Sequence, residues 1–209
     1  MKSGWKGNME IIKLDSKQKK RGTEVLTAAF FDYPMFQFYF PDPKRRARYL
    51  APYLEGALNC ALRYGEVHTT PEISGVIFTL PPDHTKISLW EYIQNGCLGA
   101  PFFLGFRNYA RVSECEAFVA EIHEKIMNGR PHYYLWGLVV DPGQQRKGVG
   151  RALLSPLLMK ADSEKRPIYL ETHEEKNVAY YQSMGFTLVH TGNIPKYDIQ
   201  LWSMLREPI

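Results

Sequence analysis

The stretch that decides the fold is GQQRKGVGR, residues 143–151, which follows the apolar run WGLVVDP (136–142) and leads into ALLSPLLMKAD (152–162). The apolar run has the composition of a buried strand, and the last segment has the apolar spacing of a helix. Glycines at such a junction leave the first backbone N–H groups of the helix free to meet an anion, and the helix dipole adds a partial positive charge. The junction therefore predicts an anion-binding loop.

Three phosphate-binding patterns compete for this loop. Gly143 and Gly148 have the GxxxxG spacing of a P-loop, but Val-Gly follows where Lys and Ser or Thr are required, which disfavours a nucleotide triphosphatase. A Rossmann fingerprint that starts at Gly148 would need a glycine where Leu153 stands. The third pattern, Q/R-x-x-G-x-G/A, is matched in full by residues 145–150.

With this third pattern the chain resembles the GNAT acetyltransferase superfamily, whose members bind the pyrophosphate of acetyl-coenzyme A through such a loop. The segment YLETHEEKNVAYYQSMGF (169–186) is similar to the next strand and helix of that family, with Asn177 and Tyr181 at matching offsets. The short interval between these two residues, the LET motif and the W-x-M-x-R motif at 202–206 resemble the puromycin-acetyltransferase-like branch. The likeness covers about residues 132–206.

The periodicity of the whole chain gives the order β-α-α-β-β-(helices)-β-α-β-α-β-β, which is typical of an α/β domain with a mixed sheet. The resemblance implies a mostly antiparallel, six- to seven-stranded sheet flanked by helices, with splayed central strands. We expect a flexible leader at residues 1–8, a single GNAT-like domain at 9–209, and a helical insertion at 86–128 before the motif strand. The insertion should break near GAP (99–101) and at Ser113.

Prolines are expected to interrupt regular structure at two places. DYPMFQFYFPDP (32–43) should end the first helix and form a loop that packs on the core through Phe36, Phe38 and Phe40. Pro156 lies inside the helix after the anion-binding loop, where it removes one backbone hydrogen bond and should kink the helix. We expect this kink to leave the loop intact.

The resemblance assigns acetyl-CoA, the implied co-substrate, to the strand LWGLVV and the loop after it, with no metal. The backbone of Leu138, Val139 and Val140 would pair with the pantetheine arm, although a core strand would have the same composition. One N–H there would face the thioester oxygen, where a single donor is worth ~3 kcal/mol. Asn177 would fix the pantetheine or a water. The residues that would hold the pyrophosphate are Gln145, Arg146, Lys147, Gly148, Val149, Gly150 and Arg151.

Acetyl transfer to an amine needs a base for the ammonium and an acid for the leaving thiolate. Tyr181 matches the family's general acid, and its neighbour Tyr180 should point elsewhere on the helix. Glu171 is the first candidate base, because a carboxylate in mid-strand is unfavourable unless it has a catalytic role or is hydrogen-bonded. His132, His173 and water are the alternative bases, and pairing with Arg or Thr is the alternative fate of Glu171.

The predicted reaction is direct attack by the primary amine of a small molecule in a ternary complex, because no cysteine lies in either motif segment to carry the acetyl group. Asp32 would attract the ammonium and Phe36 would cover the acceptor. Residues 86–128 would form a lid or a dimer contact, so a monomer and a homodimer both stay open. The alternatives are a protein N-terminal or lysine acetyltransferase, and a non-catalytic acetyl-CoA-binding regulatory module.

Bulk composition sets further limits. The net charge of +4 and the pI of about 8.8 suit a polyanionic cofactor but are too weak to indicate nucleic acid as a partner. The three cysteines are scattered and predict neither a zinc site nor a disulfide framework. We find no signal-peptide pattern and no run of ~18 apolar residues, so we expect a cytoplasmic protein without a membrane partner.

Overall fold

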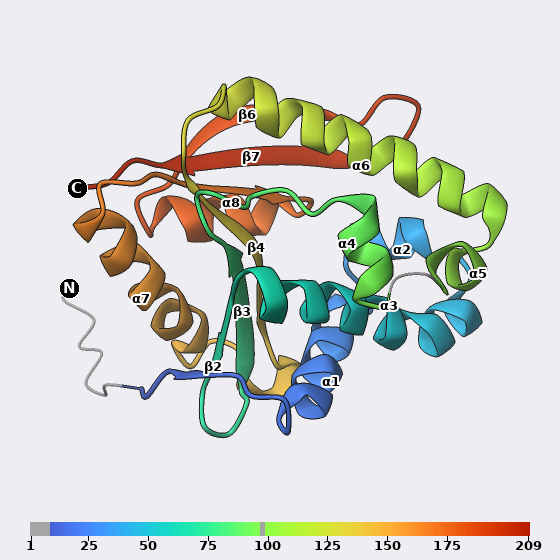
Figure 1. The fold of residues 1–209 in the computed structure, drawn as a ribbon, viewed down its shortest axis with the longest axis horizontal. Helices are drawn as coiled ribbons and strands as arrows, with labels where there is room; N and C mark the ends of the chain where they lie inside the picture. The colour runs from blue at the N-terminus through green and yellow to red at the C-terminus, as the bar shows by residue number, and fades with distance from the viewer. Residues whose placement is uncertain (1–8, 97–98) are drawn as a thin grey trace.

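The structure, a computed structural model, describes residues 9–96 and 99–209, so the expected leader at residues 1–8 lies outside the described residues. Its elements follow the predicted order except for one additional helix, α2, between the first two predicted helices (Figure 1). The strands of one sheet are β1 (Ile12–Lys13), β2 (Glu66–Thr69), β3 (Gly75–Leu80), β4 (Tyr133–Val140), β5 (Ile168–Thr172), β6 (Thr187–Asn193) and β7 (Gln200–Arg206). The helices are α1 (Lys19–Phe30), α2 (Pro34–Tyr39), α3 (Pro43–Tyr64), α4 (Leu89–Gln94), α5 (Ala100–Leu104), α6 (Phe106–Met127), α7 (Val149–Ser163) and α8 (Glu175–Gln182).

Within residues 9–96 and 99–209, the sheet has seven strands in the order β1-β2-β3-β4-β5-β7-β6. Neighbouring strands are antiparallel except for β4 and β5, which are parallel. This arrangement confirms the predicted mixed, mostly antiparallel sheet. One core cluster contains residues of α1, α3 and α6 packed on β3 and β4, and a second contains residues of α7 and α8 packed on β4 and β5. Helices therefore flank both faces of the sheet, as expected.

The central strands splay apart. The β4–β5 ladder consists of the pairs Tyr133–Ile168 and Tyr134–Tyr169. Beyond these pairs, and as far as the described residues go, β4 continues to Val140 against β3 alone, while β5 continues to Thr172 against β7 alone. The prediction of splayed strands is confirmed, and the edge of β4 that faces β5 keeps free backbone groups along the rest of its length.

A β-bulge in β4 lies where the splay begins. Thr79 is opposite Leu135 and Phe78 is opposite Gly137, which leaves Trp136 without a partner on β3. A Cβ on Gly137 would come within 2.1 Å of the Phe78 ring, so the tight register here requires a glycine. The bulge re-aims the side chains that follow it along β4.

The segment after α1 differs from the expected loop, because residues 34–39 form the helix α2. Pro34 stands in its first turn, where the missing N–H is not needed, so proline starts this helix instead of preventing it. Phe40 is buried, and Phe36 and Phe38 pack against the same core cluster. The predicted loop is therefore wrong, whereas the predicted packing through these three rings is confirmed.

The predicted break at Ser113 is also wrong. α6 runs without interruption from Phe106 to Met127, and Ser113 lies on its exposed side, where a serine is tolerated. The chain turns instead at Gly105, whose φ of +83° separates α5 from α6. Pro156 does not end α7, which runs through it to Ser163, and the kink stays a prediction.

The arginine of the C-terminal W-x-M-x-R motif holds two elements together. Arg206 of β7 is 4% exposed and donates to both carboxylate oxygens of Asp162 in α7, at 2.8 Å each. These hydrogen bonds hold the pKa of the Asp162 carboxyl down at about 2. The motif therefore has a structural role in this chain, since it ties α7 to the last strand.

Replacing Asp162 with alanine should lower the free energy of unfolding by roughly 2–3 kcal/mol, because a buried guanidinium would lose its carboxylate. Urea unfolding measures the loss. Lys176→Ala is the control: the ion pair of Lys176 with Glu174 (3.0 Å) has a lysine side chain that is 75% exposed, so the loss should stay below about 0.5 kcal/mol. Equal losses in the two variants would contradict this account of Arg206.

Candidate active site

The anion-binding loop has the predicted strand–turn–helix form. Asp141 follows β4 and accepts a hydrogen bond from the Gly143 N–H at 3.0 Å, which starts the short turn Pro142–Gln144. Arg146 and Gly148 then adopt positive φ angles of +63° and +83°, and α7 begins directly after Gly148. The first N–H groups of α7 have no partner within the helix, so they are available to an anion.

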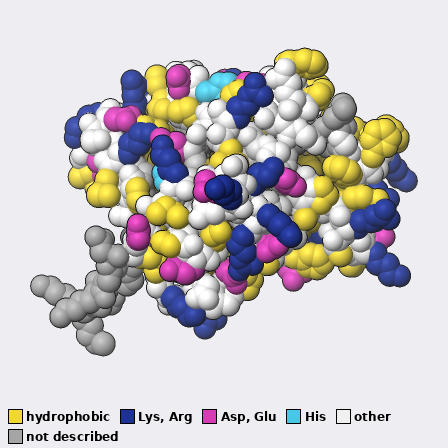
Figure 2. All heavy atoms as spheres, turned by 60° about the horizontal axis from the view of Figure 1, so that its bottom comes forward, with side chains coloured by type: hydrophobic (Ala, Val, Ile, Leu, Met, Phe, Trp, Pro, Cys, Tyr) yellow, Lys and Arg dark blue, Asp and Glu magenta, His cyan; other side chains and the backbone are white. Residues whose placement is uncertain are grey.

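The loop side chains divide into an exposed and a buried set. Val149 is 3% exposed and belongs to the core below α7. Lys147 donates to the Gly143 carbonyl at 3.1 Å and to Gln144 Oε1 at 2.9 Å, which ties the loop to itself. The lower end of the molecule in Figure 1, turned forward in Figure 2, carries basic and acidic side chains side by side. The exposed loop residues are Gln145, Arg146, Lys147 and Arg151.

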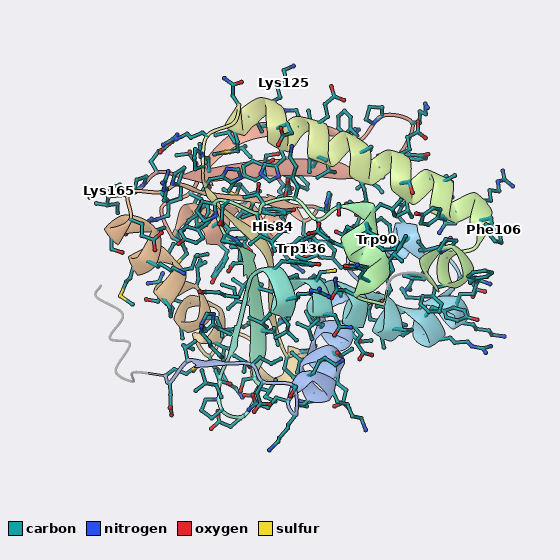
Figure 3. The ribbon with its side chains drawn as sticks, viewed as in Figure 1. His84, Trp90, Phe106, Lys125, Trp136 and Lys165 are labelled. Carbon is teal, nitrogen blue, oxygen red and sulfur yellow. The ribbon has the colours of Figure 1, made fainter. Side chains whose placement is uncertain are left out.

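The three β4 residues assigned to the pantetheine arm line the splay. Leu138 and Val140 are half-buried and pack against the α7 cluster, whereas Val139 is buried in the opposite cluster. All three pair with β3 on one edge of β4, and their other edge faces the splay. Trp136, labelled in Figure 3, is bulged at the start of this stretch and packs edge-on against Phe78.

Two tyrosines of α8 take different positions. Tyr181 is 9% exposed and packs edge-on against Phe186, and burial raises its pKa well above the ordinary value. The Tyr180 hydroxyl is buried and has no hydrogen-bond partner among the described residues. It lies 3.0 Å from the place that a Cβ on Gly150 would occupy. Tyr180 is therefore directed at the start of α7, whereas Tyr181 packs against Phe186.

Asn177, the other α8 residue of the motif, holds the end of β5. Its Nδ2 donates to Thr172 Oγ1 at 2.9 Å. The same hydroxyl lies 3.2 Å from the Tyr33 hydroxyl, which accepts the His173 backbone N–H at 2.7 Å. The side chain is therefore fixed in one orientation beside the splay.

Glu171 is a buried carboxyl with no Lys or Arg ion pair among the described residues. Its side chain is 6% exposed, and Oε1 has no hydrogen-bond partner among the residues that the structure describes. Burial raises its pKa to about 8, against the opposing effect of the Tyr134 and Tyr169 hydroxyls. The expected alternative of a structural pair with Arg or Thr is not found within the described part of the chain, where β7 places Ser203 opposite it.

The two histidines named as alternative bases are both engaged. His132 is 5% exposed, and its ring nitrogens lie 2.7 Å from the Arg130 carbonyl oxygen and 2.7 Å from His123 Nε2. His173 Nδ1 lies 2.8 Å from the Gln200 carbonyl, and burial lowers its pKa to about 4. His123 was missed by the sequence analysis, because nothing in the local pattern of α6 sets it apart from other buried helix positions.

The two residues assigned to the acceptor differ in their surroundings. The Asp32 side chain is 82% exposed and lies 4.0 Å from an Arg46 nitrogen. Phe36 is half-buried among rings, with its centroid 4.9 Å from that of Phe30 and 6.2 Å from that of Tyr53. A ligand that contacted both would have to reach from the surface to this ring cluster.

The helices of the segment 86–128 leave large rings uncovered. Trp90 and Phe106, both labelled in Figure 3, are 66% and 70% exposed. Beside α5 and α6, a hollow of about 400 Å³ is lined partly by Tyr39, Arg45 and Arg107, and it does not include Glu171. These features leave a lid and a dimer contact both open.

The described residues contain no group of three or more His, Cys, Asp or Glu side chains arranged to hold a metal ion. Within the same residues, no helix is long and apolar enough to cross a membrane.

Known proteins resemble this chain in sequence and in fold. Residues 89–186 match the family model described as "Acetyltransferase (GNAT) family". An uncharacterized N-acetyltransferase of Schizosaccharomyces pombe, C550.08, is 21% identical over 207 residues, which covers 96% of this chain and 84% of the relative.

Solved structures share the fold. A Corynebacterium glutamicum protein, described as histone acetyltransferase HPA2 and related acetyltransferase, superposes with a TM-score of 0.65 at 19% identity and covers 95% of this chain and 96% of its own. Arylalkylamine N-acetyltransferase 2 of Aedes aegypti gives a TM-score of 0.59 at 15% identity, covering 96% and 99%. The likeness to the puromycin-acetyltransferase-like branch stays a prediction. The matched motif region and the full-length likeness to an N-acetyltransferase indicate an acyl-CoA-dependent acetyltransferase of GNAT type.

Proposed function

We propose that the chain transfers an acetyl group from acetyl-CoA to the primary amine of a small molecule, by direct attack in a ternary complex. The observation that carries this proposal is the free edge of β4 beside the open N-terminus of α7. The backbone of Leu138, Val139 and Val140 would pair with the pantetheine arm. The N–H groups from Gly148 onward would receive the pyrophosphate, with the exposed loop cations around it.

Side chains near the splay would carry out the two proton transfers of the reaction. Glu171 would take a proton from the acceptor ammonium, because a base with a pKa of about 8 is far better matched to an alkyl ammonium near ~10.4 than an ordinary carboxylate. The freed amine would attack the thioester carbon, and a backbone N–H of β4 would stabilise the oxyanion. As the C–S bond breaks, Tyr181 would give its proton to the departing thiolate, and the tyrosinate would regain a proton as the new amide nitrogen loses its extra one.

Two features support a small acceptor over a protein. The rings of α2 pack into a cluster against the core, and α4 to α6 lie over the same side of the sheet, which favours a covered acceptor site over a groove for an extended peptide. Asp32 and Phe36 are retained as proposed acceptor contacts at the border of this covered region. One structural neighbour has a name that refers to histones, and another has a name that refers to arylalkylamines. The fold is therefore compatible with either acceptor class.

Calorimetric titration with acetyl-CoA tests the proposal, with adenosine 3′,5′-bisphosphate as the comparison ligand. We expect acetyl-CoA to bind, the bisphosphate to bind more weakly, and thiol release to appear with at least one amine of a screen. Absence of acetyl-CoA binding would overturn the placement of the coenzyme. Binding without thiol release for any small amine or peptide would favour the regulatory-module alternative.

The two α8 tyrosines make a matched pair of variants. Tyr181→Phe should lower kcat about 100-fold while the Kd for acetyl-CoA stays unchanged, because only the proton for the thiolate is lost. Tyr180→Phe should instead weaken acetyl-CoA binding about fivefold, since its unpartnered hydroxyl faces Gly150 at the start of α7. Steady-state kinetics and calorimetry separate the two effects. Identical behaviour of the two variants would contradict both roles.

A further inference from the structure

α6 places a histidine between the proposed base and a second histidine. His123 is 6% exposed and stacks on the Tyr169 ring, with 4.2 Å between centroids and 13° between planes. Its Nε2 lies 2.7 Å from His132 Nε2, and its Nδ1 lies 3.9 Å from Glu171 Oε1. The three side chains come from α6, β5 and the segment before β4, and they form one buried line of polar groups.

The hydrogen bonds fix the tautomers of both rings. The Arg130 carbonyl can only accept, so His132 Nδ1 carries the hydrogen that bridges their 2.7 Å separation. A neutral His132 then has its lone pair on Nε2, and His123 must donate to it from its own Nε2. Burial lowers the pKa of both rings, that of His123 to about 3, so both stay neutral near pH 7. The His123 nitrogen that faces Glu171 is therefore an acceptor.

An acceptor nitrogen suits one protonation state of Glu171 only. It can receive a hydrogen bond from the carboxylic acid, whereas two lone pairs would repel each other if the carboxyl were ionised. The separation of 3.9 Å is too long for that bond and too short for a bridging water, so the bond requires a small rotation of the carboxyl toward His123. The other groups that face this carboxyl are the hydroxyls of Tyr134 and Tyr169, Ser203 on β7, and Glu116 on α6.

We propose that His123, held in one tautomer by His132, is a positioning residue that hydrogen-bonds to protonated Glu171 and holds that carboxyl in place for proton transfer. This inference rests on the proposed role of Glu171 as the base. When the ammonium N–H bond breaks and the Glu171 O–H bond forms, His123 would stabilise the product acid. A hydrogen bond to the neutral form favours that form, which makes Glu171 the stronger base.

The first test reads the protonation pattern of the full chain without turnover. Long-range ¹H–¹⁵N spectra near pH 7 should show His132 protonated at Nδ1 and His123 protonated at Nε2, with His123 neutral from pH 6 to 8. A hydrogen on His123 Nδ1, or a titration of His123 near pH 6.5, would overturn the proposal.

The second test compares variants at position 123. His123→Phe keeps a ring on Tyr169 but removes the acceptor, whereas His123→Asn offers an amide oxygen near the place of Nδ1. ¹³C NMR of the Glu171 carboxyl should show its titration midpoint about one pH unit lower in His123→Phe and largely restored in His123→Asn. With an amine that the screen identifies, kcat should fall about tenfold in the phenylalanine variant with KM unchanged.

Lys125→Ala on the exposed side of α6 is the control, and Figure 3 labels this lysine. A Glu171 midpoint that is the same in wild type, His123→Phe and Lys125→Ala would overturn the positioning role, even if His123→Phe melted at a lower temperature. These results are independent of the coenzyme titration, so a failure of this inference is distinguishable from a failure of the proposed reaction.

Discussion

Replacing Gly148 with valine should raise the Kd for acetyl-CoA at least 100-fold, which corresponds to about 3 kcal/mol of binding free energy. Two physical reasons act together. Gly148 has a φ of +83° as the residue before α7, and a β-branched residue is strained there. Its side chain would also occupy the place where the pyrophosphate must approach the N–H groups of the helix. Calorimetric titration with acetyl-CoA measures the loss.

The same loop supplies the control. Gly143 has ordinary contact distances for an added Cβ, with Asp141 Oδ1 nearest at 3.5 Å, so Gly143→Ala should keep both the fold and the affinity. Thermal melting of both variants shows whether the fold is retained. If Gly148→Val stayed folded and bound acetyl-CoA as tightly as wild type, the phosphates would have to bind elsewhere.

The second large effect is expected for Glu171→Gln, which should lower kcat with an accepted amine by roughly 100- to 10,000-fold. The amide keeps the size and most of the hydrogen-bonding capacity of the carboxyl but cannot take a proton. The Kd for acetyl-CoA should not change, because the proposed coenzyme contacts are backbone groups of β4 and the loop. If Glu171→Gln kept the wild-type kcat, Glu171 would not be the base, and water would have to take that role.

The same substitution should change how stability depends on pH. Glu171 has a pKa of about 8 in the folded state and an ordinary value near 4.5 in the unfolded state, so the folded state binds the extra proton between these values. Stability contributed by this group is therefore lost as the pH rises from 4.5 to 8. Below pH 6.5 the buried histidines His123 and His173 act in the opposite direction, because their folded-state pKa values are lowered to about 3 and 4.

The informative window is consequently pH 6.5 to 8. Over this range wild type should lose up to about 1.4 kcal/mol per pH unit through Glu171, and the Glu171→Gln variant should lack this slope. The difference also contains a change in the titration of Glu116, whose pKa is raised to about 7 and whose charge acts on Glu171. Urea unfolding at half-unit steps measures it. Parallel curves for the two proteins would mean that Glu171 is already ionised at neutral pH in the folded state.

The local parts of the site could be predicted from the sequence. The turn that begins at Asp141, the glycine before α7 and the strand on each side follow from residue types within a few positions of one another. The splay came from the family resemblance, since periodicity cannot tell a paired strand edge from an open one. The ladder of β4 and β5, limited to the pairs at Tyr133 and Tyr134, shows it directly.

The remaining parts depend on contacts between distant segments. His123 lies close to Glu171 because α6 packs across β5. The spacing of residues within α6 does not predict this contact. Tyr180 faces Gly150 because α8 leans toward α7, which a helical wheel of α8 alone does not show. The helix α2 was missed for a local reason, because Pro34 was read as a helix breaker although proline also suits a first turn.

The short β4–β5 ladder also has a consequence for local unfolding of the native protein. With only two residue pairs between them, β1 to β4 on one side and β5, β7 and β6 on the other form two ribbons that are fastened at one end. In native-state hydrogen exchange these ribbons should open as separate cooperative units, the amides of one exchanging without those of the other. If the pantetheine arm of acetyl-CoA paired with β4 in the splay, it would connect the two parts of the sheet. Binding would then make them open as one unit and would slow exchange in both.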